Sequence, residues 1–411
     1  MHYYQFLTAF ISTSVNPYRL LFSLCVGALV LVPACHSPGQ ADESSLRPDV
    51  LTITVDDPVP TDRKVKATFS YTDVKGTTVY PGKMERRGGY SISFPKHSYE
   101  IDLKEDIMLG GLPADDDWIL NANYIDKTFL RHVLSYELFA AMDPDNEAPR
   151  TRFVEVRLNG QYNGLYVLME KLDRSSLGIN KGDTAAVVFK EPHLFRSSYE
   201  GIRPKDSLNF HQQTFPKIKK ADRRESVEAL RQLLLSPEAD DFRARLETAF
   251  DLDNLLDWHL LLLVTNNGDG ILKNFYLYRT DAASPYRIAP WDYDHSFGRD
   301  GDNERNLDER PADLTRSLLF ARLLKTDWYR TALRQRWDIH TESGTLNQDN
   351  LKKRIRTHAA RIRPAALRNF DRWPVTDDRY FDINGFDEEI DLMLEFVDVR
   401  YARLTAYFDD L

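Results

Sequence analysis

The residues best suited to chemistry lie in one stretch, 266–298 (NNGDGILKNFYLYRTDAASPYRIAPWDYDHSFG). Asp269 is followed five positions later by Asn274, and Asp292 and Asp294 come near the end of the stretch. These side chains offer hard oxygen ligands, and neither a cysteine nor a cluster of histidines accompanies them. Such donors favour Mg²⁺ or Mn²⁺ over zinc. The stretch therefore predicts a divalent-metal site.

The order of these residues matches that of a protein-kinase active site. There a catalytic-loop aspartate is followed five positions later by an asparagine, then by a short hairpin and a metal-binding aspartate with a glycine nearby. Strand-like runs at 274–279 and 286–289, joined by an Asp/Ser/Pro turn, supply the hairpin here. The order suggests that Asp269 orients or deprotonates a nucleophile and that Asn274 and Asp292 bind the metal.

A plainer alternative is that these side chains are solvated turn residues. Aspartate and asparagine are common in turns. Asp292 and Asp294 alternate along the chain, so on a strand both would face one side, as two solvated carboxylates do. The combination of loop, hairpin and paired aspartates behind a very apolar helix at 255–266 favours the metal site.

A pair of glycines is the best candidate for a phosphate-binding turn. The segment 86–91 (RRGGYS) brings backbone N–H groups and Arg87 together, and Lys96 follows on the next strand. Glu170 is expected where two lobes join, to pair with Lys96, to contact the nucleotide or to cap the next segment. An ordinary glycine turn with exposed bases is the alternative, because the sequence has neither a G-x-G-x-x-G nor a Walker A motif.

Composition narrows the class of protein and its partners. With 42% apolar and 28% charged residues, the chain is typical of a soluble globular protein. A formal net charge of −9 and the lack of a long basic run argue against nucleic acid as the main partner. Cys25 and Cys35 are the only cysteines, so the sequence after them predicts neither an internal disulfide nor thiolate catalysis.

Residues 1–35 resemble an export signal. Arg19 precedes an apolar run at 20–32 that is short for a transmembrane helix. The residues up to Cys35 resemble a bacterial lipobox, in which the cysteine is lipidated and becomes the mature N-terminus. The expected location is therefore the cell envelope, with the chain lipid-anchored to the membrane. Residues 36–60, rich in Ser, Pro, Asp and Glu, are predicted to form a tether, with a short strand within it at 51–55 as the alternative for that part.

From residue 61 onward the sequence predicts an α+β fold with two lobes. Residues 61–190 are expected to form antiparallel strands, with a hairpin turn at Asn159 and Gly160 and one helix at 127–142. Residues 191–411 are expected to be largely helical. The metal-site stretch thus lies in the helical lobe and the glycine pair in the strand lobe.

Four blocks in one order resemble the CotH (spore coat protein H) family of atypical protein kinases. They are RRGGYSISFPKHSYEI, WILNANYIDKTFLR, VEVRLNGQYNGLYVLMEKLD and the stretch from NGDGILKNFYLY to PWDYDHSFG, at residues 86–101, 118–131, 154–173 and 267–298. One block alone means little, but the ordered set is specific. Two positions depart from the family, because RGGYS replaces its R-G-x-S-S/T pattern and His97 replaces a lysine.

The resemblance implies a protein-kinase-like fold that binds ATP and Mg²⁺ or Mn²⁺ and phosphorylates serine or threonine of a protein acceptor. The family's catalytic aspartate corresponds to Asp269, and its metal-binding aspartate to Asp292 first and Asp294 second. Arg87 and Lys96 correspond to positions near the nucleotide.

Two other functions stay open. A lipoprotein outside the cytoplasm meets little ATP, so the chain is alternatively a pseudokinase scaffold that keeps the fold and binds a partner. The same acidic cluster also suits a metal-dependent hydrolase or transferase acting on another phosphate ester. Thermal stabilisation by nucleotide and metal distinguishes the scaffold, and phosphate release without labelled protein distinguishes the hydrolase.

Overall fold

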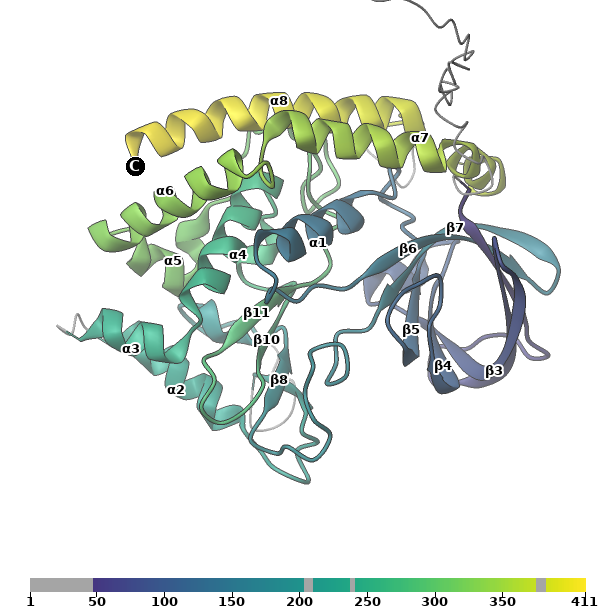
Figure 1. Cartoon of the computed structure of the whole chain (residues 1–411), viewed down its shortest axis with the longest axis horizontal. Coiled ribbons are helices and arrows are strands. Elements are labelled where there is room, and N and C mark those ends of the chain that lie inside the picture. Colours follow the sequence, from purple (N-terminus) through teal and green to yellow (C-terminus); the bar gives the residue numbers. More distant parts are fainter. Residues whose placement is uncertain (1–46, 203–209, 237–240, 375–381) are drawn as a thin grey trace, which may run out of the picture. The chain divides into compact units, whose positions relative to one another are not determined.

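The computed structural model describes residues 47–202, 210–236, 241–374 and 382–411. They belong to one compact unit, which runs from Glu43 to Leu411 (Figure 1). The predicted export signal, Cys35 and the first part of the predicted tether lie outside the described residues, so the lipid anchor stays a prediction. Within the described ranges, no helix combines the length and the apolar character needed to cross a membrane.

Seven strands close into a barrel (Figure 1). The strands are β1 (Asp49–Thr54), β2 (Val65–Asp73), β3 (Gly76–Arg87), β4 (Ser98–Ile107), β5 (Asp115–Asn121), β6 (Thr151–Leu158) and β7 (Gln161–Glu170), in the order β1-β2-β3-β4-β5-β7-β6. Every second residue of β2 from Val65 to Tyr71 is buried, as the period of a half-buried strand requires. Phe69, Ile101 and Trp118 are among the side chains that form the barrel's own apolar core.

The barrel closes through one parallel pair of strands. β1 pairs antiparallel with β2 and parallel with β6, which places Leu51 opposite both Tyr71 and Val156. The predicted tether boundary at residue 60 is therefore wrong, because Leu51 and Ile53 are fully buried in a barrel strand. The expectation of purely antiparallel strands is wrong for the same pair. The predicted hairpin, by contrast, is confirmed: Asn159 and Gly160 form a two-residue turn with φ of 48° and 79°.

A second sheet of four strands carries the metal-site stretch. Its order is β11-β10-β8-β9, from β8 (Val187–Lys190), β9 (Gln212–Phe215), β10 (Phe275–Arg279) and β11 (Arg287–Pro290). The predicted boundary between lobes at residue 190 is therefore wrong, because β8 pairs with β10 instead of a barrel strand. The hairpin expected within 266–298 is confirmed as β10 and β11.

The helices pack on one another and on both sheets (Figure 1). They are α1 (Arg131–Met142), α2 (Arg224–Leu235), α3 (Phe242–Ala249), α4 (Leu252–Thr265), α5 (Leu318–Leu323), α6 (Asp327–Glu342), α7 (Gln348–Arg372) and α8 (Phe386–Asp410). α1 packs on α4 and β11, and α7 packs on α8 and on barrel strand β7. The fold is thus a mixed α+β arrangement of a barrel, a small sheet and a helical C-terminal region.

Two helix ends position the functional stretch. α4 begins at its N-cap Asp251, whose carboxylate accepts the Asn254 N–H at 3.0 Å, and ends at Asn266 in the left-handed conformation. α1 begins at Arg131, four residues later than expected. Asp126 precedes it and accepts the Arg131 N–H at 3.1 Å. The end of α4 thus determines where Asp269 lies, and the start of α1 determines where His132 lies.

Candidate active site

Two adjoining cavities lie between the barrel and the second sheet. Their volumes are 320 Å³ and 480 Å³, and both are lined by Gly89 and Ser91 of the glycine turn and by His132 and Asp292. Asp269, Asn274, Asp294 and Lys96 line the smaller cavity. Arg87, Lys190 and Trp291 line the larger one. The structure therefore brings the predicted metal site and the predicted phosphate turn to one place.

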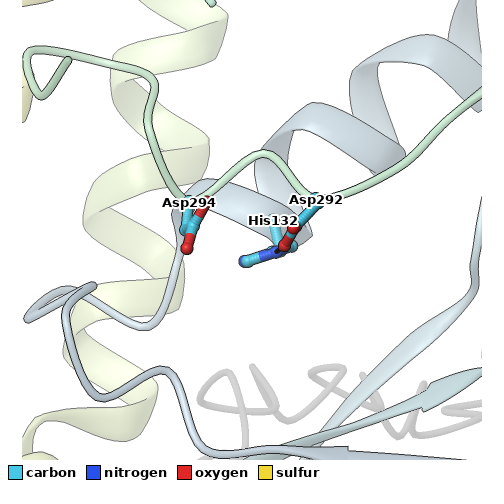
Figure 2. A group of neighbouring side chains, drawn as sticks. All are labelled: His132, Asp292 and Asp294. Carbon is cyan, nitrogen blue, oxygen red and sulfur yellow. Dashed lines mark hydrogen bonds and ion pairs between the residues drawn. The ribbon is translucent and has the colours of Figure 1, made fainter. Parts of the chain in front are cut away.

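Three potential metal ligands meet at the smaller cavity (Figure 2). His132 comes from the first turn of α1, while Asp292 and Asp294 come from the loop after β11. One ligand atom from each residue lies within 4.8 Å of the others, and the His132 Nε2 is 3.4 Å from the Asp292 Oδ1. His132 is almost fully buried, whereas the Asp292 side chain is 53% exposed. One ligand of the group is thus buried, and another is exposed to the cavity.

The loop holds its aspartates through backbone contacts. Asp292 has a φ of 59°, and its N–H donates to the Tyr136 hydroxyl of α1 at 3.0 Å. The Asn274 side-chain N–H donates to the Asp292 carbonyl at 2.8 Å, so a metal-binding role of Asn274 falls to its amide oxygen. Asp292 and Asp294 do not alternate along a strand, because β11 ends at Pro290. The turn after the strand lets both carboxylates reach one cavity.

The three ionisable side chains of this group shift one another's pKa values. The surrounding protein partly withdraws the Asp292 carboxylate from water, which raises its pKa, but the His132 imidazole and the Arg87 guanidinium outweigh this effect and lower that pKa below its usual value. Burial and the nearby Asp292 charge raise the pKa of Asp294. Burial lowers the pKa of His132, and the two carboxylates together raise it above its usual value. A dication relieves such repulsion between carboxylates, so the residues fit a bound metal.

Asp269 lines the smaller cavity. It begins a short 3₁₀ turn, and its carboxylate is 31% exposed and lies 3.0 Å from the Lys273 ammonium. A Cβ placed on Gly301 would come within 3.9 Å of this carboxylate, so the loop after Gly298 also passes close by. Asp269 is accessible to a hydroxyl entering the cavity and has a cation beside it.

Lys96 is held by the protein itself. Its ammonium donates to the Ala122 carbonyl at 2.7 Å and to the Leu165 carbonyl, and it lies 4.3 Å from the ring centroid of Tyr166. Only 1% of the residue is exposed, and burial lowers its pKa well below the usual value. Lys96 therefore contributes to the wall of the cavity in a site that disfavours its charge.

The predicted nucleotide contacts are divided between two places. The Arg87 guanidinium lies 5.7 Å from the centroid of the Trp291 ring, in the larger cavity. Glu170 lines neither cavity; it accepts the Arg150 N–H at 2.8 Å and pairs with the Arg150 guanidinium at 3.2 Å. The structure thus brings Arg87 to the site. Of the three alternatives predicted for Glu170, pairing with Lys96 is not formed, because the carboxylate pairs with Arg150.

A buried charged network supports the site from behind, centred on Glu389 of α8. Its carboxylate pairs with Lys127 at 3.3 Å, with Arg131 at 3.2 Å and with Arg299. The Arg131 Nε also donates to the Ser296 carbonyl at 2.8 Å. Arg131 directly precedes His132, and Ser296 lies in the loop that carries the aspartates. The network therefore fixes both halves of the candidate metal site.

The sequence did not predict His132 as a site residue, because no cluster of histidines accompanies the oxygen ligands of the stretch 266–298. The residue follows directly after the block at 118–131 but lies 160 positions from Asp292, so only the fold brings them together. An imidazole beside two carboxylates suits Mn²⁺ and later transition metals better than an all-oxygen site does.

We expect His132→Phe to lower Mn²⁺ affinity at least about tenfold, since losing a ligand or its immediate support has effects of this size. In the wild-type protein, pulsed electron paramagnetic resonance of bound Mn²⁺ should show coupling to an imidazole nitrogen that the variant lacks. His97→Phe is the control, because His97 lines neither cavity. Coupling that persists in His132→Phe would exclude His132 as a ligand.

Comparison with known proteins adds a family match. A family model described as "CotH kinase protein" matches residues 84–404, a range that contains all four sequence blocks. The "Inner spore coat protein H" of Bacillus subtilis (strain 168) is 26% identical over 367 residues, covering 87% of this chain and 92% of that protein. Among solved structures, the Helicobacter pylori proinflammatory kinase CtkA aligns with 84% of this chain and 97% of its own, at 8% identity and a TM-score of 0.27.

Proposed function

The chain belongs to the CotH kinase protein family, and on that premise we propose that it is an ATP- and divalent-metal-dependent protein kinase. The proposed acceptor is a serine or threonine hydroxyl of another protein. The proposed fold is a two-lobed, protein-kinase-like one, with the barrel as the smaller lobe. The observation that supports this most is the convergence of Asp269, Asn274, Asp292 and Asp294 on one cavity that also receives the glycine turn.

Each residue has a proposed role. Asp269 accepts a hydrogen bond from the acceptor hydroxyl and takes its proton as the oxygen attacks the γ-phosphorus and the bond to the ADP oxygen breaks. Asp292 and the Asn274 amide oxygen would hold the metal, with Asp294 and His132 beside them. A bound dication neutralises phosphate charge there. Positioning and electrostatics supply most of the catalysis in such a reaction.

The larger cavity is the proposed place for the nucleoside. The face of Trp291 receives Arg87 and Lys190 at 5.7 Å and 5.6 Å from the ring centroid, so a ring and two cations line one wall. Gly88 has a φ of 134°, and a Cβ there would meet the Ser91 hydroxyl at 2.2 Å. Only glycine fits this turn, which brings backbone N–H groups to the junction of the two cavities.

A second candidate function is that of a pseudokinase scaffold. The observation that favours it is the state of Lys96, whose ammonium is bonded to backbone carbonyls in a buried site. A location in the cell envelope, which is proposed on the sequence alone, also limits the supply of ATP. The two functions differ in whether nucleotide and metal bind.

The experiment that separates them is thermal unfolding of the full chain with ATP, with Mg²⁺ or Mn²⁺, and with both together. A kinase should gain stability from the combination, because ligands that bind the native state stabilise it by about 2.7 kcal/mol at a hundred times their Kd. A midpoint that is the same with and without ATP and metal would contradict nucleotide binding and favour the scaffold.

Lys96→Met tests the proposed phosphate contact separately. We expect a loss of about 1–3 kcal/mol in the free energy of unfolding, because two buried carbonyls lose their donor. If Lys96 also contacts phosphate, the Kd for ATP, measured calorimetrically on the folded variant, should rise about tenfold or more. An unchanged Kd beside a lower stability would restrict Lys96 to a structural role.

A further inference from the structure

A groove separate from the two cavities is lined by residues of α7, of barrel strands and of the segment before β1; Figure 1 shows α7 passing over the barrel. The groove has a volume of 850 Å³ and shares no lining residue with either cavity. Its lining includes five arginines and two carboxylates, and no lysine: the arginines are Arg47, Arg157, Arg361, Arg368 and Arg372. This concentration of positive charge is notable in a chain whose formal net charge is −9.

Most of these guanidinium groups have no carboxylate partner. Arg368 pairs with Glu155 of β6 through two contacts, of 2.8 Å and 3.1 Å. Among the described residues, no carboxylate lies within ion-pair distance of the other four arginines. The Arg361 Nε is buried without a hydrogen-bond partner there, and burial and the nearby Arg152 lower the pKa of Arg361. Cations that line one groove without carboxylate partners repel one another, so an anion would stabilise them.

The arrangement of the arginines indicates the size of that anion. Arg361, Arg368 and Arg372 follow one face of α7 at spacings of seven and four residues, a distance of roughly 16 Å from first to last. Arg157 on β6 and Arg47 before β1 lie across the groove. One phosphate cannot contact both ends of such a row. Guanidinium groups bind phosphate oxygens in pairs, which lysine does not.

We propose that this groove binds two or more phosphate groups at once. A soluble polyphosphate carries them on one molecule, and a membrane surface presents them as neighbouring anionic lipid headgroups. Arg47 favours lipid headgroups as the source, because it lies within the segment 36–60 that the sequence predicts as a tether from a membrane anchor. The proposal does not depend on kinase activity, since the groove and the candidate active site have separate linings.

The test compares the full chain with a groove variant and a matched control. The groove variant is Arg157→Gln with Arg361→Gln, which removes two unpaired guanidinium groups without breaking an ion pair. The control is Arg356→Gln with Arg363→Gln, which removes the same charge from exposed positions on α7 outside the groove. Thermal unfolding of all three proteins should give similar midpoints, since surface pairs such as that of Arg363 and Asp387 contribute little.

Calorimetry with tripolyphosphate is the first arm. We expect the Kd of the groove variant to rise about tenfold for each lost guanidinium, and that of the control to match the wild type. Binding that persists equally in the wild type and the groove variant belongs to the active-site cavities and would overturn the proposal. An equal loss in the control variant would also overturn it, because the effect would then be one of overall charge.

Vesicles form the second arm and distinguish the sources. Co-sedimentation is measured with vesicles of three parts phosphatidylcholine to one part phosphatidylglycerol, and with phosphatidylcholine alone. The predicted leader contributes equally to every variant, so the difference between wild type and groove variant is the readout. If the wild type co-sediments more than the groove variant only with phosphatidylglycerol vesicles, and tripolyphosphate removes that difference, the ligand is a set of lipid headgroups. If tripolyphosphate binds the groove without any difference in co-sedimentation, the ligand is a soluble polyphosphate. No groove-dependent binding in either arm overturns the proposal.

Discussion

Asp269→Asn is expected to lower the rate of phosphotransfer by about 10²–10⁴-fold while leaving metal and nucleotide binding nearly unchanged. The asparagine keeps the size of the side chain but cannot take the proton of the acceptor hydroxyl. Its partner Lys273 is 47% exposed, so the loss of this ion pair should change stability by no more than about 1 kcal/mol. The measurement is single-turnover phosphotransfer at saturating ATP and metal, beside the Kd for each ligand.

Two comparisons make this result specific. Asp253 is exposed in the first turn of α4, at the end opposite to Asp269, and lines neither cavity. The Asp253→Asn protein should therefore transfer phosphate at the wild-type rate. Asp292→Asn should lose metal binding together with transfer, because its carboxylate belongs to the candidate metal site. An Asp269→Asn protein with the wild-type rate would show that another group accepts the proton.

Glu389→Gln should destabilise the fold by about 3–5 kcal/mol, the largest stability effect that the structure predicts for one isosteric change. The glutamate is fully buried and pairs with three cations, Lys127, Arg131 and Arg299. Two other carboxylates also pair with these cations, Asp382 with Lys127 and Arg299, and Asp126 with Arg131. A neutral amide at position 389 therefore leaves three buried cations with two carboxylates. Glu388→Gln is the control, because Glu388 neighbours it on α8 but is exposed. Denaturant unfolding measures both.

The loss of stability in Glu389→Gln should depend on pH. Burial by itself raises the pKa of Glu389, but Arg131, Arg299 and Lys127 hold it at about 2, below the ordinary value of 4.5. The unfolded chain therefore takes up the proton first as the pH falls. The stability that wild type has over Glu389→Gln should be complete above about pH 4.5 and disappear between there and about pH 2. A difference that does not change with pH would show that packing, not charge, is lost.

Local sequence patterns predicted much of the secondary structure. The turn at Asn159 and Gly160 is confirmed, since a two-residue hairpin depends on neighbouring residues. The membership in the CotH family is likewise confirmed, because four blocks in order carry more information than any one of them. The strand Asp49–Thr54 was assigned to the tether instead of the folded domain, because its polar surroundings resemble a tether and its partners lie far along the chain.

The parts of the site that escaped prediction depend on contacts between distant segments. Asp269, Asn274, Asp292 and Asp294 come from one stretch, so their common location could be predicted. His132 reaches them only because α1 packs on α4 and β11. The pairing of Glu170 with Arg150 across strands, and of Lys96 with carbonyls of two segments, is set by the barrel, which no local pattern determines.

Incubation of the full chain with ATP labelled in the γ-phosphate tests whether this cavity transfers phosphate to protein. We expect covalent label on the protein or on an added protein acceptor, which requires Mg²⁺ or Mn²⁺ and is lost in both Asp269→Asn and Asp292→Asn. Released phosphate without labelled protein would instead indicate a hydrolase. Neither product, under conditions in which wild type is folded, would contradict the claim.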